Sequence, residues 1–172
     1  AGITYTSPVG VYAGVWASGV DFGTNKPDFE VDYFVGYNVD LSEKVNFDVM
    51  LNRYTYPDAA GGNFAELITK TTFFDNYSAT VAYTDDFFGL DEESFYYALG
   101  ASYDLPKDFS VALNVGHTTI SEKLDYDDYT DYGVMFSKSF GAVTASLGYV
   151  GTDSHGETNF GPWAEDRVVF SL

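Results

Sequence analysis

Hydrophobic and polar residues alternate with a period of two along most of this chain. In residues 30–41, apolar side chains occupy every odd position, and the even positions carry mainly polar or small residues. Residues 45–52, 95–105 and 110–116 alternate in the same way. This period is typical of β-strands with two different faces, whereas helical periodicity is nearly absent. The pattern therefore predicts an all-β fold.

Eleven strands are predicted from this alternation and from the turn residues between the alternating segments. Many of them reach about ten residues, which exceeds the length of about five or six in globular proteins and matches a tilted strand that crosses a bilayer. No linker or change in composition divides the chain, so residues 1–172 are predicted to form a single domain. The predicted strands cover approximately residues 1–7, 11–22, 30–41, 45–56, 64–75, 78–88, 95–105, 109–120, 129–140, 143–153 and 165–172.

The connections between these strands alternate between short and long. This alternation is typical of up-and-down barrels of the outer membrane, which have tight periplasmic turns and longer external loops. We therefore predict an up-and-down antiparallel transmembrane β-barrel. Bacterial single-chain barrels have even strand numbers, so about twelve strands are expected, with one N-terminal strand added to the eleven; ten would remain if residues 1–7 lay outside the barrel. The short connections lie near residues 8–10, 42–44, 76–77, 106–108 and 141–142, and the long ones at 23–29, 57–63, 89–94, 121–128 and 154–164.

The charge of the chain narrows the range of functions. The chain has 26 Asp and Glu against 8 Lys and Arg, which gives a formal net charge of −18. This balance argues against nucleic acid as a partner, because phosphate binding needs Lys and Arg. The absence of cysteine excludes disulfides, thiol catalysis and Cys-ligated zinc. Aromatic residues make up 19% of the chain, yet no run of about 18 apolar residues predicts a membrane-spanning helix.

The apolar face of the strands is predicted to contact lipid, with aromatic residues near the strand ends as interfacial girdles. A soluble acidic carrier of the lipocalin type would show the same alternation, with its apolar face inside. The strand length and the small or polar residues on the opposite face favour lipid. The polar face would then line the lumen. The predicted pore-lining residues are Glu30, Asp32, Asp40, Asn46, Asp48, Asn52, Glu66, Lys70, Asp104, Asn114 and Asp131.

Uncompensated acids in the lumen would create a negative field that favours cations and disfavours anions. The alternative is a closed lumen, in which the acids pair with Lys70 and Arg167 and tyrosine side chains fill the bore. A barrel of about twelve strands is narrower than porins of about 16 to 18 strands, which hold a clear aqueous channel. Both an open and a closed lumen are therefore compatible with the sequence.

Candidate sites for catalysis or metal binding are few. The acidic stretch 125–131 could bind calcium through carboxylate oxygens, but it lacks the spacing and the glycine of an EF-hand loop, and it also reads as a solvated external loop. The two histidines, His117 and His155, stand in no pattern that implies a nucleophile with an oriented base. We therefore expect no enzyme activity and no cofactor. The calcium candidates are Asp125, Asp127 and Asp128.

Five segments follow one another along the chain in a characteristic order. They are GVYAGVWASGVDF (10–22), the E-x-D-x-x-x-G-Y pattern of Glu30, Asp32, Gly36 and Tyr37, RYTYP (53–57), the N-F-x-E-L pattern of Asn63, Phe64, Glu66 and Leu67, and DYTDYGV (128–134). In this order they resemble the TorF-like porin family of proteobacterial outer-membrane β-barrels, over nearly the whole chain. The resemblance implies a porin-like barrel and an additional N-terminal segment, and it does not define the transported solute.

These features together predict a porin-like barrel in the outer membrane of a Gram-negative bacterium. Small hydrophilic solutes, cations preferred, are expected to diffuse passively through its acidic lumen. The expected partners are outer-membrane lipid, lipopolysaccharide and small solutes, with further copies of the chain or an envelope protein as additional candidates. The alternative is a closed structural or interaction barrel, whose external loops bind a surface partner or neighbouring copies.

Overall fold

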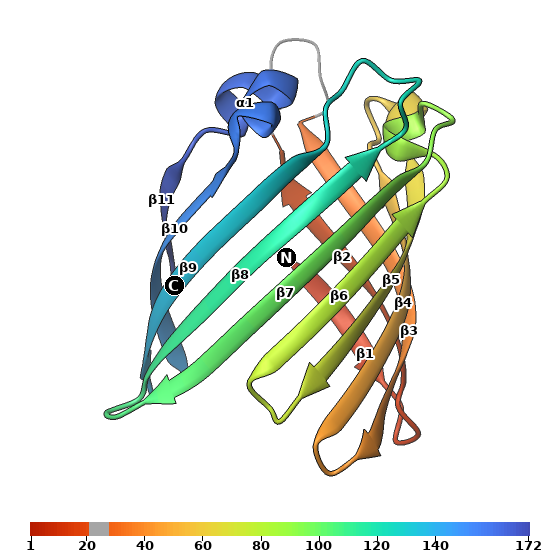
Figure 1. The fold of residues 1–172 in the computed structure, drawn as a ribbon. Helices are drawn as coiled ribbons and strands as arrows, with labels where there is room; N and C mark the ends of the chain where they lie inside the picture. The colour runs from red at the N-terminus through yellow and green to blue at the C-terminus, as the bar shows by residue number, and fades with distance from the viewer. Residues whose placement is uncertain (21–27) are drawn as a thin grey trace.

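The computed structural model describes residues 1–20 and 28–172, which form one antiparallel sheet of eleven strands (Figure 1). All eleven predicted strands are found in this part of the chain. The strands are β1 (Gly2–Thr6), β2 (Val11–Gly19), β3 (Phe29–Ser42), β4 (Val45–Thr55), β5 (Phe64–Phe73), β6 (Tyr77–Thr84), β7 (Ser94–Leu105), β8 (Phe109–Ile120), β9 (Tyr129–Phe140), β10 (Val143–Thr152) and β11 (Arg167–Ser171). The loops contain three short 3-10 turns, η1 (Ala60–Gly62), η2 (Phe87–Gly89) and η3 (Gly161–Trp163), and one helix, α1 (Ser154–Phe160).

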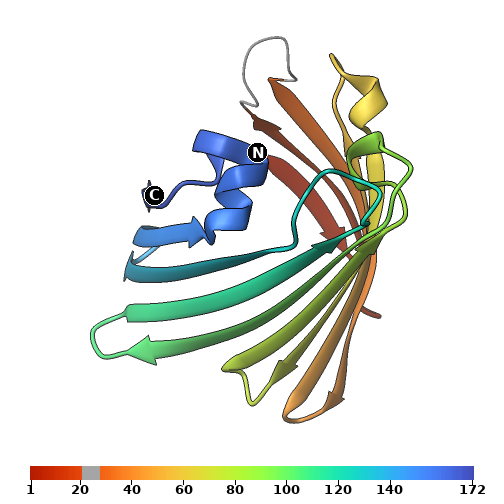
Figure 2. The ribbon, with the colours of Figure 1, turned by 45° about the horizontal axis from the view of Figure 1, so that its top comes forward.

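Every strand pairs with the next one along the chain, in the order β1 to β11. All these pairings are antiparallel, so β1 and β11 run in the same direction. Figure 2 shows that the sheet curls around a central space. The predicted all-β, up-and-down barrel is therefore confirmed. Within the described residues β1 and β11 form no ladder with each other, and the twelfth strand stays a prediction.

The short turns gather at one end of the barrel and the long loops at the other (Figure 1). The predicted alternation of connection lengths is therefore correct. At the short-turn end, β5 stops at Phe73 because Phe74 and Asp75 adopt positive φ angles of 52° and 63°, which break the extended backbone. Residues 21 and 22 of the predicted strand 11–22, and most of the predicted loop 23–29, lie outside the described residues.

Two features of the loop end differ from the sequence prediction. The predicted strand 78–88 is too long, because β6 ends at Thr84 and the chain then turns into η2, where Phe88 has a φ of 50°. Helix α1 lies in a segment that was predicted to be a plain loop. No helix within the described ranges is long and apolar enough to cross a membrane.

The two faces of the curled sheet differ in chemistry. On the convex face, large apolar side chains stay exposed around the wall, as Val35, Leu99 and Phe136 illustrate with exposed fractions of 48%, 63% and 55%. The concave face carries most of the polar members of the strands, and its residues are less exposed near the loop end. An apolar outside and a polar inside is the reverse of a soluble β-barrel, so this arrangement disfavours the lipocalin-type carrier.

Candidate functional site

The acidic residues of the described strands all lie on the concave face. Strand register places them there, because each one pairs with a residue of a neighbouring strand that faces the same side. The concave face also holds two basic residues, Lys70 and Arg167. The acidic residues are Glu30, Asp32, Asp40, Asp48, Glu66, Asp104 and Asp131. Together with Asn46, Asn52, Lys70 and Asn114, they are the residues predicted to line the pore; that they border an open channel stays a prediction.

The convex face of the described strands carries two residues that are charged at neutral pH, and both are basic. Arg53 lies at the loop end of β4 and Lys138 lies near the short-turn end of β9. The Lys138 ammonium donates to the backbone oxygen of Lys107, lies 3.6 Å from the Asp108 carboxylate, and lies 4.7 Å from the ring centre of Phe109. A long basic side chain that turns its charge toward a strand end while its stem follows an apolar wall is typical of a membrane interface.

A tyrosine on the concave face reaches across a whole strand. The Tyr12 hydroxyl on β2 donates to Oδ1 of Asp48 on β4, at 2.7 Å. Gly36 on β3 lies between them, and a Cβ atom there would come within 2.3 Å of the Tyr12 ring. The Tyr12 side chain can therefore cross β3 only because residue 36 is a glycine. The Asn38 side chain donates to the other Asp48 oxygen at 3.0 Å, so both carboxylate oxygens are bonded.

The same arrangement occurs a second time on the concave face, across strands β7, β8 and β9. The Tyr96 hydroxyl on β7 donates to Oδ1 of Asp131 on β9, at 3.3 Å. Gly116 on β8 lies between them, and a Cβ atom there would come within 2.3 Å of the tyrosine oxygen. The Asn114 side chain also donates to Asp131, at 3.4 Å. Each of these Tyr–Gly–Asp bridges ties three strands together across the concave face.

The basic residues of the concave face do not neutralise its acids. In the described part of the chain, the two ion pairs are Lys123–Glu92 in the loops and Lys138–Asp108 at the short turns. Arg167 donates instead to the backbone oxygen of Pro162. The pairing of lumen acids with Lys70 and Arg167, which a closed lumen would use, is therefore not seen in these residues. The concave face keeps a net negative charge.

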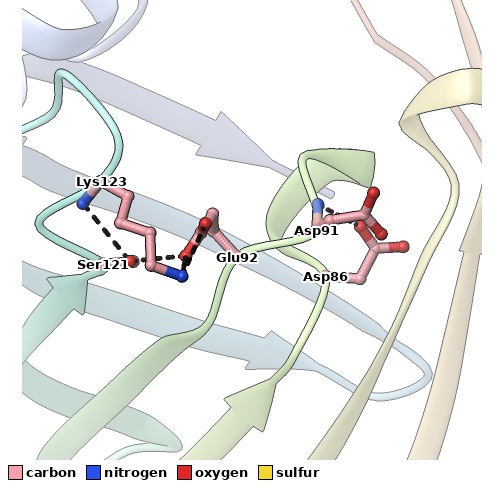
Figure 3. A network of polar contacts seen from close by, with 5 residues as sticks. All are labelled: Asp86, Asp91, Glu92, Ser121 and Lys123. Atoms are coloured by element: carbon pink, nitrogen blue, oxygen red, sulfur yellow. Dashed lines mark hydrogen bonds and ion pairs between the residues drawn. The ribbon is translucent and has the colours of Figure 1, made fainter.

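A salt bridge joins two loops that are separated in sequence (Figure 3). The Lys123 ammonium lies 3.0 Å and 3.2 Å from the two carboxylate oxygens of Glu92, and the Ser121 hydroxyl donates to Glu92 at 2.7 Å. These bonds from Ser121 and Lys123 stabilise the charged form and lower the pKa of Glu92 below its usual range. The contact fixes the loop before β7 against the loop after β8.

Helix α1 is held against the start of β9 by its own cap. Asp153 is the N-cap residue, and its carboxylate accepts hydrogen bonds from the backbone N–H groups of His155 and Gly156 at 3.1 Å each and from Thr130 at 2.9 Å. Although partial desolvation opposes ionisation, these N–H groups lower the pKa of Asp153 overall. Asp153 was a usable sequence signal for the helix start, because aspartate is a favoured N-cap residue.

Aromatic side chains line a cavity of about 950 Å³ at the loop end. Four loops contribute to it, since its walls come from η1, η2, the loop after β8, and the α1–η3 segment. No local sequence pattern marks this cavity, because its residues lie far apart in the chain and come together only in the folded loops. The aromatic residues of its wall are Tyr56, Phe87, Phe88, Tyr126, Tyr129, Phe160 and Trp163.

The calcium candidates of the acidic stretch are not assembled into a site. In the described residues, no group of three or more His, Asp or Glu side chains is placed to hold a metal ion. One Asp128 carboxylate oxygen instead accepts the backbone N–H of Ile120 at 2.8 Å. Asp127 is bonded through its backbone to the Asn159 side chain, at 3.0 Å and 2.7 Å. These aspartates therefore organise the loop.

The histidines take part in local hydrogen bonds at the loop end. Nδ1 of His117 lies 3.1 Å from the Thr130 hydroxyl on the convex face, and within the described ranges no carboxylate is bonded to this imidazole. Nδ1 of His155 donates to the backbone oxygen of Asp128 at 3.1 Å. Among the residues that the structure describes, neither histidine belongs to a group in which a third side chain orients a catalytic base.

The fold and its two faces define a porin-like β-barrel, with a polar concave face and an apolar convex one. The chain belongs to the family described as "Bacterial protein of unknown function (Gcw_chp)", whose sequence profile matches residues 1–170. A solved structure of the NanC porin, in a rhombohedral crystal form, is similar to this chain with a TM-score of 0.68 and 11% sequence identity, and the match covers 98% of this chain and 87% of that one. No curated protein sequence matches the chain significantly.

Proposed function

We propose that this protein is a porin-like barrel through which small hydrophilic solutes diffuse passively across the outer membrane of a Gram-negative bacterium, with a preference for cations. The observation that carries this proposal is the separation of charge: every acidic residue of the described strands lies on the concave face, and the two charged residues of the convex face, Arg53 and Lys138, are basic and lie near strand ends. An apolar exterior is stable in hydrocarbon, and a negative interior concentrates cations.

The same proposal covers the finer assignments. Membership of the TorF-like porin family is part of it, on the five sequence segments that carry the resemblance. The exposed apolar wall supports contact with outer-membrane lipid, and the acidic loops would reach lipopolysaccharide phosphates through divalent cations. The barrel acts without catalysis or cofactor in this account.

One observation favours a second candidate, a closed scaffold barrel whose loops bind a surface partner or neighbouring copies. The bridges Tyr12–Asp48 and Tyr96–Asp131 place aromatic rings over the concave face, where they narrow the space inside the sheet. The closed scaffold predicts a folded barrel that passes no solute.

Liposome swelling separates the two candidates. Liposomes that contain the folded barrel are placed in isotonic solutions of arabinose or of an ammonium salt, and the rate of swelling is followed by light scattering. Diffusion through the barrel predicts faster swelling than in empty liposomes, and the heat-unfolded protein serves as the control. Rates equal to those of empty liposomes in both solutions would contradict the porin and support the closed scaffold.

A further inference from the structure

Two deeply buried oxygen atoms on the concave face lack a hydrogen-bond partner among the described residues. They are Oδ1 of Asp32 on β3 and Oδ1 of Asn52 on β4. The exposed fractions of these residues are 9% and 4%, so water has little access to them. A buried acceptor without a donor costs free energy, and an unpaired buried carboxylate costs more. Both atoms therefore need a donor that the described residues do not provide.

The two orphan acceptors lie close enough to share one donor group. Asp32 pairs with Tyr54, and Asn52 pairs with Phe34, so Asp32 and Asn52 are diagonal neighbours on adjacent strands and face the same side. Diagonal neighbours have Cα atoms about 7–8 Å apart, so two side chains that face the same side can both reach one group with several N–H donors. An ammonium group has three such donors and supplies the charge that Asp32 needs.

The surroundings of this pair favour a cation over a neutral donor. Tyr54 pairs with Asp32 in the strand register. Its hydroxyl donates to Oε2 of Glu66 on β5 at 3.0 Å, which places Glu66 near the pair. Glu30 is two residues before Asp32 and faces the same side. Neither basic residue of the concave face, Lys70 or Arg167, forms an ion pair with these acids in the described part of the chain, and Arg167 donates to the backbone oxygen of Pro162. A bound cation would therefore interact with the carboxylates of Asp32, Glu30 and Glu66.

A continuous row of aromatic rings connects this pair with the cavity at the loop end. From the cavity, the ring of Phe88 lies 5.1 Å from Phe64, and Phe64 stacks on Tyr54 at 4.5 Å with an angle of 21° between the ring planes. Along the cavity wall, Phe88 contacts Phe87 at 4.9 Å, and Phe87 contacts Tyr126 at 6.5 Å. Ring faces attract both flat apolar groups and cations.

The loops that form the cavity are also strongly acidic, which favours a cation. These loops carry one basic residue, Lys123, which is already paired with Glu92. A cavity of about 950 Å³ is large enough for a small organic molecule. The acidic residues of the four loops are Asp58, Asp85, Asp86, Asp91, Glu92, Glu93, Glu122, Asp125, Asp127, Asp128, Asp153, Glu157, Glu165 and Asp166.

We propose that the barrel binds an organic cation that consists of a primary ammonium group on a flat apolar body. The apolar body lies against the aromatic rings between the cavity and Tyr54, and the ammonium group donates to Asp32 and Asn52. The proposal deepens the proposed function, because it names the solute class of the same barrel. The binding proposal depends on the proposed porin function in one respect: the solute is taken to enter the barrel from the loop end.

Four probes of graded chemistry test this proposal with the purified, folded barrel in zwitterionic detergent. Benzylammonium has both the ring and the N–H donors; methylammonium lacks the ring, benzyl alcohol lacks the charge, and benzyltrimethylammonium lacks the N–H donors. Binding is measured by calorimetry. We expect benzylammonium to bind about tenfold more tightly than each of the other three, because each lacks one of the two interactions. Equal binding of benzyl alcohol and benzylammonium would overturn the proposal.

The two tryptophans of the chain report where the probe lies. Trp16 pairs with Asp32 in the strand register, and Trp163 lines the cavity. We expect benzylammonium to change the fluorescence of both the Trp16→Phe and the Trp163→Phe variants, because each keeps one tryptophan beside the proposed path. An unchanged emission in the Trp163→Phe variant, whose remaining indole is next to Asp32, would contradict binding at that carboxylate.

Substitutions identify the residues that receive the ammonium group. Asp32→Asn is expected to weaken benzylammonium binding about tenfold, whereas Asp104→Asn, an acid near the other end of the concave face, is expected to leave it unchanged. If Asp32→Asn fails to fold, as judged by heat-modifiable migration, Asn52→Ala is the second variant. It is expected to weaken benzylammonium about threefold and to leave benzyltrimethylammonium unaffected. Equal effects of Asp32→Asn and Asp104→Asn, or no effect of Asn52→Ala, would overturn the proposal.

The binding experiments need no ion flow, so they fail independently of the proposed diffusion function. A barrel that binds benzylammonium but does not conduct would support this inference and contradict the porin. A conducting barrel that binds none of the probes would support the porin and overturn this inference.

Discussion

The hydroxyl of Tyr12 on β2 donates to the carboxylate of Asp48 on β4, and the tyrosine side chain crosses β3 at Gly36, which has no side chain to block it. A second tyrosine, Tyr96, reaches Asp131 over Gly116 in the same way. Each bridge binds the hydroxyl of an aromatic residue to an acid on the concave face, where an asparagine side chain also donates to the same carboxylate. The two bridges brace the concave face of a wall in which each described strand forms its ladders with its immediate neighbours.

Gly36→Ala tests the first bridge. The added Cβ atom would meet the Tyr12 ring at 2.3 Å and the Tyr12 hydroxyl at 2.4 Å, so the ring must move and its bond to Asp48 must break. We expect the free energy of unfolding in detergent to fall by about 1–3 kcal/mol, as for other overpacked positions. Urea unfolding followed by tryptophan fluorescence measures it. Gly61→Ala is the control, because nothing lies within 4 Å of a Cβ atom there. Equal stability of the two variants would refute the bridge.

Leu99→Arg tests whether the convex face contacts lipid. Leu99 lies in the middle of β7 on the convex face and is 63% exposed. An arginine on the lipid face near the bilayer midplane costs about 2–4 kcal/mol. We therefore expect the folded fraction in phospholipid vesicles to fall, as measured by heat-modifiable migration after denaturant titration. The matched control is Thr80→Arg, which places the same charge on the concave face of the neighbouring strand. A protein that tolerates Leu99→Arg but not Thr80→Arg would instead be a soluble barrel.

Acid should loosen the loop contact between Glu92 and Lys123. The contact lowers the pKa of Glu92 in the folded protein, so it contributes stability above the usual glutamate pKa and loses it as the pH falls through the lowered value. We expect the protection factors of the amides in residues 121–124, which correct for the slower intrinsic exchange in acid, to fall at low pH, and Glu92→Gln to lower them already at neutral pH. Glu93→Gln is the control, because Glu93 contributes its backbone oxygen to Ser121. Identical exchange in both variants would show that the ion pair does not hold the loops.

The strands could be predicted from the sequence because each has two different faces. The alternation of Val31, Asp32 and Tyr33 along β3, for example, fixes which side chains share a face without any knowledge of the partners. The concave positions of Asp48 and Glu66 follow from the same period of two. A shift of one residue would have moved all the polar side chains of a strand to the other face.

The loop end could not be predicted in this way, because its structure depends on contacts between distant segments. Tyr126 and Phe160 stack at 5.8 Å although 34 positions separate them, and no local pattern marks that pair. The two Tyr–Gly–Asp bridges are equally non-local, since a glycine in a strand does not reveal which ring will cross it. Helix α1 was missed for a different reason: it is one short segment whose only sequence signal is the cap at Asp153.

The reversal potential of single barrels in a planar bilayer tests the central claim most directly. A tenfold KCl gradient is applied across a membrane that contains the folded protein, and the triple variant Asp32→Lys, Asp48→Lys and Glu66→Lys is compared with the natural sequence. Because the concave face is acidic, we expect steady current steps with a reversal potential on the cation-selective side, and we expect the triple variant to reverse its sign. Anion selectivity of the natural sequence, or a folded barrel with no current at all, would contradict it.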